Sequence, residues 1–150
     1  MNVAVGLGCD RGTPLATLQD ALRAALAQAG ALAPDVVAAA SITLKADEAG
    51  LLALAAKQGW AMTFFTPAQL AGVPVPNPSE TVRRYTGTPS VSEAAALLAG
   101  ARVFGHEQAL PMTALLVEKF KHRGADGRNA TVSIARCDSF LFLTPERSTP

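Results

Sequence analysis

Residues 75–100 read VPNPSETVRRYTGTPSVSEAAALLAG, and this stretch contains two helix-start signals. In the first, NPSE at 77–80, a capping residue is followed by a proline at the first helical position and an acid at the third. The second is a capping box, SVSE at 90–93, which the chain approaches through Thr88-Pro89. The stretch therefore predicts two consecutive helices, one near 78–85 and one over 91–99.

Two helix starts this close together indicate a site for an anion. Each presents backbone N–H groups without partners and the positive end of a helix dipole. Gly87 lies between them and can take a backbone angle that other residues resist. The alternative is that both are well-capped connections with no ligand. Glu80 and Glu93 stand where a glutamate normally closes a cap, and a carboxylate tied to the backbone is a poor general base, so capping is the favoured role for both.

Upstream of this stretch, buried strands alternate with helices. The run at 2–7 is apolar and β-branched and ends near glycine, which is typical of a buried strand. Thr13 is predicted to cap the next helix, with Pro14 at its first position and Gly30 at its end. The other elements predicted here are strands over 35–44 and 60–65, a helix that runs through Leu51, Leu54 and Ala55 to Gly59, and a short helix at 68–71.

Downstream, the sequence predicts a β-hairpin and a tail. Strands over 114–118 and 130–136 flank a polar, basic connection, 119–129. Between the last helix and the hairpin, Val103-Phe104 can add a brief strand, and residues 137–150 form a tail or an edge segment through Phe140-Leu141-Phe142. The alternation predicts one α/β domain over 1–150, a three-layer α/β/α sandwich around a mixed, mostly parallel sheet of about five strands.

Composition excludes several classes of protein. Hydrophobic residues make up 49% of the chain and charged residues 17%, which excludes a disordered chain. The net charge of +1 argues against a nucleic-acid partner. Cys9 and Cys137 form no paired pattern, as expected in a reducing cytoplasm. The N-terminus lacks a basic leader and no apolar run approaches membrane-spanning length, so we expect a cytoplasmic protein without membrane contact.

The turns that follow the first three strands, at 8–13, 43–48 and 65–67, are predicted to lie along one rim of the sheet, where ligands of such folds bind. In the first turn, GCDRGT, the glycines can aim backbone N–H groups at an anion, and Arg11 and Thr13 can add a guanidinium and a hydroxyl. An alternative for Arg11 is a solvated turn residue.

The same turn contains Gly6-x-Gly8-x-x-x-Gly12, which is close to a dinucleotide-binding fingerprint. Its last glycine comes one residue too late. Thr43 and Lys45 also stand where an acid would hold a ribose hydroxyl. We therefore expect no nicotinamide or flavin cofactor.

Lys45 and Glu48, at the start of a helix, have two interpretations. They can bind a carboxylate and supply a base, or they can form a surface salt bridge, which is the favoured reading. A basic cluster in the hairpin connection is either a solvated loop or, if it folds over the rim, a positive wall for a polyanion. The cluster comprises Lys119, Lys121, His122, Arg123 and Arg128.

No metal site or resident cofactor is predicted. His106 and His122 have no companion at metal-ligand spacing, and no HExxH, GxSxG or paired-cysteine pattern occurs. Cys9 lies near a helix start but has no histidine within sequence reach, so it is interpreted as a small filler.

Four motifs, in this order, resemble the CobE / CbiG C-terminal family of cobalamin-biosynthesis proteins. They are GCDRGT (8–13), SITLKADEAGLLALA (41–55), VPNPSETVRRYTGTPSVSEAAALL (75–98), and LLVEK (115–119) with ATVSIAR (130–136). The resemblance spans nearly the whole chain, and the chain looks most like the stand-alone members, which lack the extra N-terminal region of CbiG proteins.

The resemblance implies a role in building the corrin ring, with a macrocyclic ligand that bears many acetate and propionate groups. Two features depart from the family: Asp10 stands where a basic residue is usual, and 126–129 is an insertion in the hairpin. The residues expected to bind the ligand are Gly8, Arg11, Gly12, Thr13, Lys45, Asn77, Ser79, Gly87, Thr88, Ser90 and Lys119, with Pro78, Pro89 and Glu93 as structural caps.

Three functions follow as hypotheses. The leading one is a protein of the aerobic corrin pathway that binds a precorrin or hydrogenobyrinic-acid-like intermediate. The second is a hydrolase that, as CbiG proteins do, opens a precorrin lactone or C–C bond and releases acetaldehyde; Glu48 or Glu80 would activate water and Lys45 would stabilise the oxyanion. The third is a module that passes intermediates to precorrin methyltransferases through an apolar patch at Trp60 or 140–142.

Overall fold

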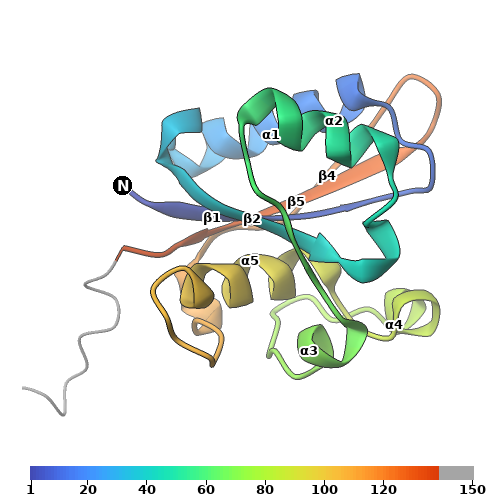
Figure 1. Ribbon diagram of the computed structural model, residues 1–150. Helices are drawn as coiled ribbons and strands as arrows, with labels where there is room; N and C mark the ends of the chain where they lie inside the picture. Colours follow the sequence, from blue (N-terminus) through green and yellow to red (C-terminus); the bar gives the residue numbers. More distant parts are fainter. Residues whose placement is uncertain (139–150) are drawn as a thin grey trace, which may run out of the picture.

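The computed structural model describes residues 1–138, which form one β-sheet between two layers of helices (Figure 1). The strands are β1 (Val3–Cys9), β2 (Val36–Ile42), β3 (Thr63–Phe65), β4 (Leu115–Arg123) and β5 (Asn129–Arg136). The α-helices are α1 (Leu15–Ala29), α2 (Ala49–Gln58), α3 (Pro67–Ala71), α4 (Glu80–Thr86) and α5 (Val91–Arg102). Single turns of 3-10 helix occur at Ala33–Asp35, Thr43–Lys45 and Met112–Ala114.

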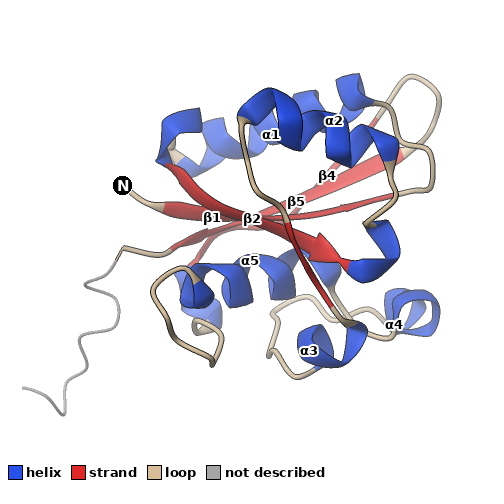
Figure 2. Ribbon diagram, viewed as in Figure 1, coloured by secondary structure: helices blue, strands red, loops and turns tan. Residues whose placement is uncertain are grey.

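The five strands have the order β3-β2-β1-β5-β4. β1, β2 and β3 pair in parallel, whereas β5 is antiparallel to both of its neighbours, so β5 alone runs against the other strands (Figure 2). The predicted sandwich around a mixed, mostly parallel sheet is confirmed. The terminal hairpin does more than add an edge to the sheet. Its strand β5 pairs along the whole of β1, and of the two hairpin strands only β4 lies at the edge.

Alternate side chains of β1 serve two different cores. Val3, Val5 and Leu7 pack with α1 and α2 on one face, as the period of a strand requires. Ala4 packs with α5 and α3 on the other. Gly6 also belongs to this second face, and a Cβ atom there would overlap the carbonyl oxygen of Ser92. The glycine therefore allows α5 to lie directly against β1 (Figure 1).

α5 is a buried helix, whereas α1 has the single buried stripe predicted from its leucines. Every residue of α5 except Arg102 is buried. This helix runs beyond the predicted 91–99, and the brief strand predicted at 103–104 is wrong, because Val103 has helical backbone angles and ends α5. Complete burial carries the polar side chains of Ser92 and Glu93 into the interior at the first turn of the helix.

β4 pairs with β5 out of simple register. The pairing shifts twice, between Leu115 and Val117 and again between Val117 and Phe120. Val117 and Phe120 both pack with the α1 core, so the second shift reverses the alternation along the strand. Lys119 and Lys121 consequently project to the opposite side, beside α4 and the start of α5.

The predicted basic connection over 119–129 is therefore wrong. Residues 119–123 continue β4, and β5 begins at Asn129, so the loop contains only residues 124–128. The sequence suggested a loop because these residues are polar, but an edge strand tolerates charged side chains and even uses them against aggregation.

The predicted start of α4 is also corrected. Ser79, not Asn77, is the capping residue, since its Oγ accepts a hydrogen bond from the Val82 N–H at 3.2 Å. The helix begins at Glu80, so Pro78 precedes it instead of occupying its first position. The side chain of Asn77 bonds to residues of α5 and β4 instead.

The other two predicted caps are not formed by side chains. Pro14, not Thr13, holds the cap position of α1, and the Thr13 hydroxyl donates to the carbonyl of Asp10 instead. Ser90 does precede α5, but its side chain makes no capping hydrogen bond, so the predicted capping box with Glu93 is absent. The local sequence signals therefore predicted the positions of these helices correctly, but the predicted capping contacts were wrong.

The predicted third strand, 60–65, begins only at Thr63, and Trp60 packs against the core beneath α1 and α2. No helix in residues 1–138 is both long and apolar enough to cross a bilayer. The predicted tail over 137–150, with its edge segment at 140–142, lies outside the described residues apart from Cys137 and Asp138.

Candidate functional site

A cleft of about 500 Å³ opens at the carboxyl ends of β1 and β2, the rim at which ligands of such sheets bind. One side is formed by the turn after β1 and by Lys45. The other is formed by α4, the start of α5 and the β4–β5 hairpin. The lining residues are Gly8, Cys9, Asp10, Arg11, Ile42, Lys45, Thr81, Val82, Tyr85, Thr86, Val91, Ser92, Lys119, Lys121, Asn129 and Thr131.

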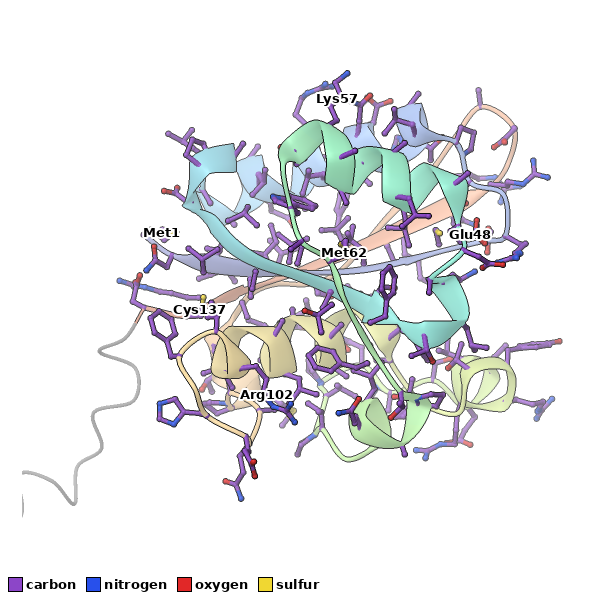
Figure 3. All side chains as sticks on the ribbon, viewed as in Figure 1. Met1, Glu48, Lys57, Met62, Arg102 and Cys137 are labelled. Carbon is purple, nitrogen blue, oxygen red and sulfur yellow. The ribbon has the colours of Figure 1, made fainter. Side chains whose placement is uncertain are left out.

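Glu48 holds the first side together, and we call it and its partners Arg11, Gly12, Lys45 and Asp47 the carboxylate corner. The Glu48 side chain is only 4% exposed. One of its oxygens accepts the Gly12 N–H at 3.0 Å, and the other lies 2.9 Å from Nη1 of Arg11 and 3.6 Å from Nζ of Lys45. Figure 3 shows Glu48 beside the loop that follows β1.

The anion that fills the first turn is therefore the protein's own carboxylate. The Gly12 N–H, expected to face a ligand, donates to Glu48, and the buried Thr13 hydroxyl donates to the carbonyl of Asp10 at 2.7 Å. Gly12 has a φ of 79°, which the turn requires. Of the residues predicted in this turn, Gly8 and Arg11 line the cleft, whereas Gly12 and Thr13 serve the turn itself.

Arg11 is shared between the cleft and the carboxylate corner. Its guanidinium makes a two-pronged pair with Asp47, at 2.9 and 2.8 Å, in addition to its bond with Glu48. Hydrogen bonding to Asp47 is the main cause that raises the pKa of Arg11, and the same bond lowers the pKa of Asp47. The favoured interpretation of Lys45 and Glu48 was a surface salt bridge. The ion pair is present at 3.6 Å, with Arg11 as its third member, but it is not at the surface, because the two side chains are 17% and 4% exposed.

Lysines dominate the charge of the cleft, and we call Lys45, Lys119 and Lys121 the lysine triad. Lys45 comes from the turn after β2, and the other two come from β4. Lys121 is exposed, and its side chain forms no ion pair or hydrogen bond within residues 1–138. Burial lowers the pKa of Lys119, an effect that Lys121 reinforces and Glu93 opposes. Three lysines, one from the turn after β2 and two from β4, thus face one cleft, in a protein of net charge +1.

The segment 77–89, which carries α4, forms a flap over the second side of the cleft. The Ser79 N–H donates to the Pro89 carbonyl at 2.9 Å and closes the flap at its neck. No residue of α4 is fully buried, and Val82 is partly buried against the core that contains α5. Gly87 ends the helix with a φ of 83°.

Asn77 fastens the flap to the body of the protein. Its Nδ2 donates to the carboxylate of Glu93 at 2.6 Å and to that of Glu118 at 2.9 Å, and its N–H donates to Glu93 at 3.3 Å. Nζ of Lys119 donates to the Asn77 carbonyl at 2.9 Å. Glu93 is completely buried, so its function is to anchor this loop and not to cap its own helix.

Several residues predicted to contact the ligand do not line the cleft. Thr88 and Ser90 are completely buried, and their hydroxyl oxygens have no hydrogen-bond partner in the described chain. Glu80, the second candidate base, is an exposed residue that pairs with Arg83 at 3.1 Å. Asn77 and Ser79 position the flap. These residues support the structure around the cleft without lining it.

Two predictions about nucleophiles and metals can be compared with the geometry. Burial raises the pKa of Cys9 to about 11, so the thiol that lines the cleft stays protonated near neutral pH. The described residues include no group of three His, Cys, Asp or Glu side chains able to hold a metal ion. His122 instead lies 4.0 Å from Asp20 of α1, on the other face of the sheet.

Sequence reasoning missed the part of the lining that α4 contributes. It assigned no role to the α4 residues Thr81, Val82, Tyr85 and Thr86, which follow the helical spacing of one face. That spacing was a usable signal once the helix had been predicted. The orientation of Lys121 had no comparable signal, because it depends on the shifted register of β4.

Comparison with known proteins finds relatives of one kind. Residues 3–135 match the family model described as cobalamin synthesis G C-terminus. A cobalt-precorrin-5A hydrolase of Priestia megaterium is 41% identical over 96 residues, which are 64% of this chain and 26% of that protein. A protein named CobE, from a Sinorhizobium species, is 36% identical over 102 residues, 67% of this chain and 66% of that protein.

Solved structures give the same answer. The crystal structure of CobE, described as a protein from the cobalamin (vitamin B12) biosynthetic pathway, superimposes with a TM-score of 0.71 and 32% identity. The match covers 91% of this chain and 92% of that one. The cobalamin biosynthesis protein chiG from Agrobacterium tumefaciens matches with a TM-score of 0.53 and 25% identity, over 87% of this chain and 96% of that one.

Proposed function

This chain belongs to the cobalamin synthesis G C-terminus family and has a role in cobalamin biosynthesis, within which we propose that it binds a precorrin or hydrogenobyrinic-acid-like polycarboxylate intermediate. The ligand occupies the cleft at the carboxyl ends of β1 and β2. Its carboxylates pair with Lys119 and Lys121, and the carboxylate corner, in which Glu48 holds Lys45, keeps the rim in shape.

The observation that carries this proposal is the convergence of Lys45, Lys119 and Lys121 on one cleft. Lys121 has no anionic partner within residues 1–138, and Lys119 is paired only with a neutral backbone carbonyl. Cations left without carboxylates inside a concave site attract an anionic ligand and hold it by charge-assisted hydrogen bonds. A ligand with many carboxylates distributed around a ring can reach both of these lysines together.

Titration with hydrogenobyrinic acid tests the proposal. We expect saturable binding at micromolar concentration, with a change in the corrin absorption spectrum. Because exposed ion pairs are screened by salt, the affinity is expected to fall when ionic strength is raised from 0.05 to roughly 0.5 M. If no binding occurs at micromolar ligand and low salt, the proposal is wrong.

The second candidate is hydrolysis of a precorrin lactone or C–C bond, and the identity with cobalt-precorrin-5A hydrolase is the observation that favours it. The match covers only 26% of that relative, so its activity does not transfer as a whole. Glu48 has both oxygens occupied by Gly12, Arg11 and Lys45, and Glu80 lies outside the lining of the cleft. A water-activating carboxylate among these two would first have to lose its present partners.

Product analysis separates the two candidates. A hydrolase releases acetaldehyde from cobalt-precorrin-5A, and this product can be trapped and quantified. We expect the isolated chain to release none while it still binds a corrin polyacid. Release that depends on Glu48, lost in Glu48→Gln, would make the hydrolase the better description.

A further inference from the structure

Tyr85 occupies an unusual position for an aromatic side chain. It lies in α4 at the cleft, and 79% of its surface is exposed. The Tyr85 hydroxyl makes no hydrogen bond to any described residue. Isolated exposed aromatic residues are common on protein surfaces. Tyr85 differs from them because it lines a concave site, where it is the one aromatic side chain among the described lining residues.

The flap explains how Tyr85 is exposed and still held at the cleft. No residue of α4 is fully buried, although Val82 is partly buried against the core that contains α5, and both ends of the flap are fastened. The neck bond joins Ser79 to Pro89, and Asn77 is tied to the buried carboxylate of Glu93. The helix thus presents Val82 and Tyr85 to the cleft.

Two groups of residues in the cleft lining offer different chemistry. The lysine triad supplies positive charge but no apolar surface that could hold the middle of a flat ligand. Val82 and Tyr85 of α4 supply an apolar and aromatic surface without charge. A ligand that satisfies both groups has anionic groups at its periphery and a conjugated ring system at its centre.

We propose that Tyr85 packs against the conjugated ring system of the bound polycarboxylate and so selects macrocycles over other polyanions. This proposal rests on the proposed function and adds the residue that recognises the ring. Contact between an aromatic side chain and the face of a flat conjugated ring adds affinity without requiring particular hydrogen bonds.

Variants of Tyr85 titrated with hydrogenobyrinic acid provide the first test. Tyr85→Phe keeps the ring and should bind within twofold of wild type, whereas Tyr85→Ala should bind about tenfold more weakly. Leu32→Ala, which truncates an exposed apolar residue outside the cleft lining, is the matched control and should bind like wild type. Because α4 buries no side chain, Tyr85→Ala should keep its circular dichroism and its unfolding midpoint.

A spectroscopic test does not depend on affinity. The chain has one Trp and one Tyr, so in a Trp60→Phe background Tyr85 is the sole strong emitter. Saturation with hydrogenobyrinic acid should quench at least half of its emission and protect it from acrylamide. Citrate, a polycarboxylate without a ring, should leave the emission unchanged.

The outcomes separate the two proposals. Wild-type affinity in Tyr85→Ala, with unchanged tyrosine emission at saturation, overturns the role of Tyr85 and leaves corrinoid binding in place. Equal quenching by citrate also overturns it. If the wild type binds no hydrogenobyrinic acid, corrinoid binding fails and the role of Tyr85 fails with it.

Discussion

The carboxylate corner and the flap side of the cleft are built on opposite principles. In the corner, the Glu48 carboxylate, 4% exposed, accepts hydrogen bonds from Arg11 and the Gly12 N–H, so charge is matched inside the protein. Across the cleft, Lys119 donates to a backbone carbonyl and Lys121 makes no contact with a described anion. One side is electrostatically complete, and the other has cations in excess.

This difference shows that a motif typical of an anion site is not always free to bind a ligand. A glycine turn before a helix and a neighbouring arginine are typical of an anion site, and the corner has both. Its anion is Glu48, which comes from the same chain 36 residues away from Gly12. A motif therefore shows that an anion binds there and leaves open whether that anion is a ligand or a side chain.

The largest expected effect comes from removing the anion of the corner. Glu48→Ala leaves Arg11, Lys45 and the Gly12 N–H without their shared acceptor, so we expect the free energy of unfolding to fall by about 2 kcal/mol. Urea denaturation followed by circular dichroism measures it. Asp47→Ala is the matched control, because Asp47 pairs with the same arginine but its side chain is 71% exposed, and it should change the unfolding midpoint little.

The comparison of the two sides breaks if Glu48→Ala unfolds at the same urea concentration as wild type. In that case the corner would not depend on its internal carboxylate, and its cations would be as available as those of β4. Glu48→Gln refines the result, since it keeps an acceptor for the Gly12 N–H while removing the charge that Arg11 and Lys45 need.

The second effect concerns the side with excess cations. Lys121→Glu replaces an attraction with a repulsion at an exposed position, so the affinity for hydrogenobyrinic acid should fall by about tenfold, or ~1.4 kcal/mol, without loss of stability. Lys57→Glu is the matched control, because it makes the same change in net charge on α2, outside the cleft lining (Figure 3). Equal losses in the two variants would mean that net charge alone attracts the ligand.

The layered fold could be predicted because its signals are local. The short run of β-branched and small apolar residues over 2–7 predicts a buried strand, and the leucine stripe before Gly30 predicts α1. The position of the ligand-binding rim could be predicted because parallel strands place their carboxyl ends at the same edge of the sheet. The ion pair of Lys45 with Glu48 could also be predicted from the sequence, since the two residues are three apart on one turn.

The contacts of the site were harder to predict from the sequence because they join residues that are far apart along the chain. Asn77 looked like a helix cap, yet it bonds to Glu93 and to Glu118, which is 41 residues away. The two lysines of β4 looked like part of a loop. Their orientation depends on a register shift between Val117 and Phe120, and no pattern within β4 alone announces that shift.

The smallest expected effect is a dependence of binding on alkaline pH that comes from Lys119. Burial lowers the pKa of this lysine from its usual value, so it loses its charge at a lower pH than an exposed lysine does. Affinity for hydrogenobyrinic acid should therefore fall severalfold as pH rises from 8 toward 10. Lys119→Arg should remove most of this fall, because a guanidinium stays charged throughout the range.

The contribution of Lys119 to stability does not produce such a fall in affinity. Since the pKa of Lys119 is lower in the folded protein, the unfolded chain binds the proton more tightly, and the contribution of Lys119 to the free energy of unfolding rises with pH in this window. Affinity and this stability term thus move in opposite directions. Affinity that stays constant between pH 8 and 10 in wild type, or falls equally in Lys119→Arg, would show that Lys119 does not contact the ligand, and the excess of cations would then lie with Lys121 alone.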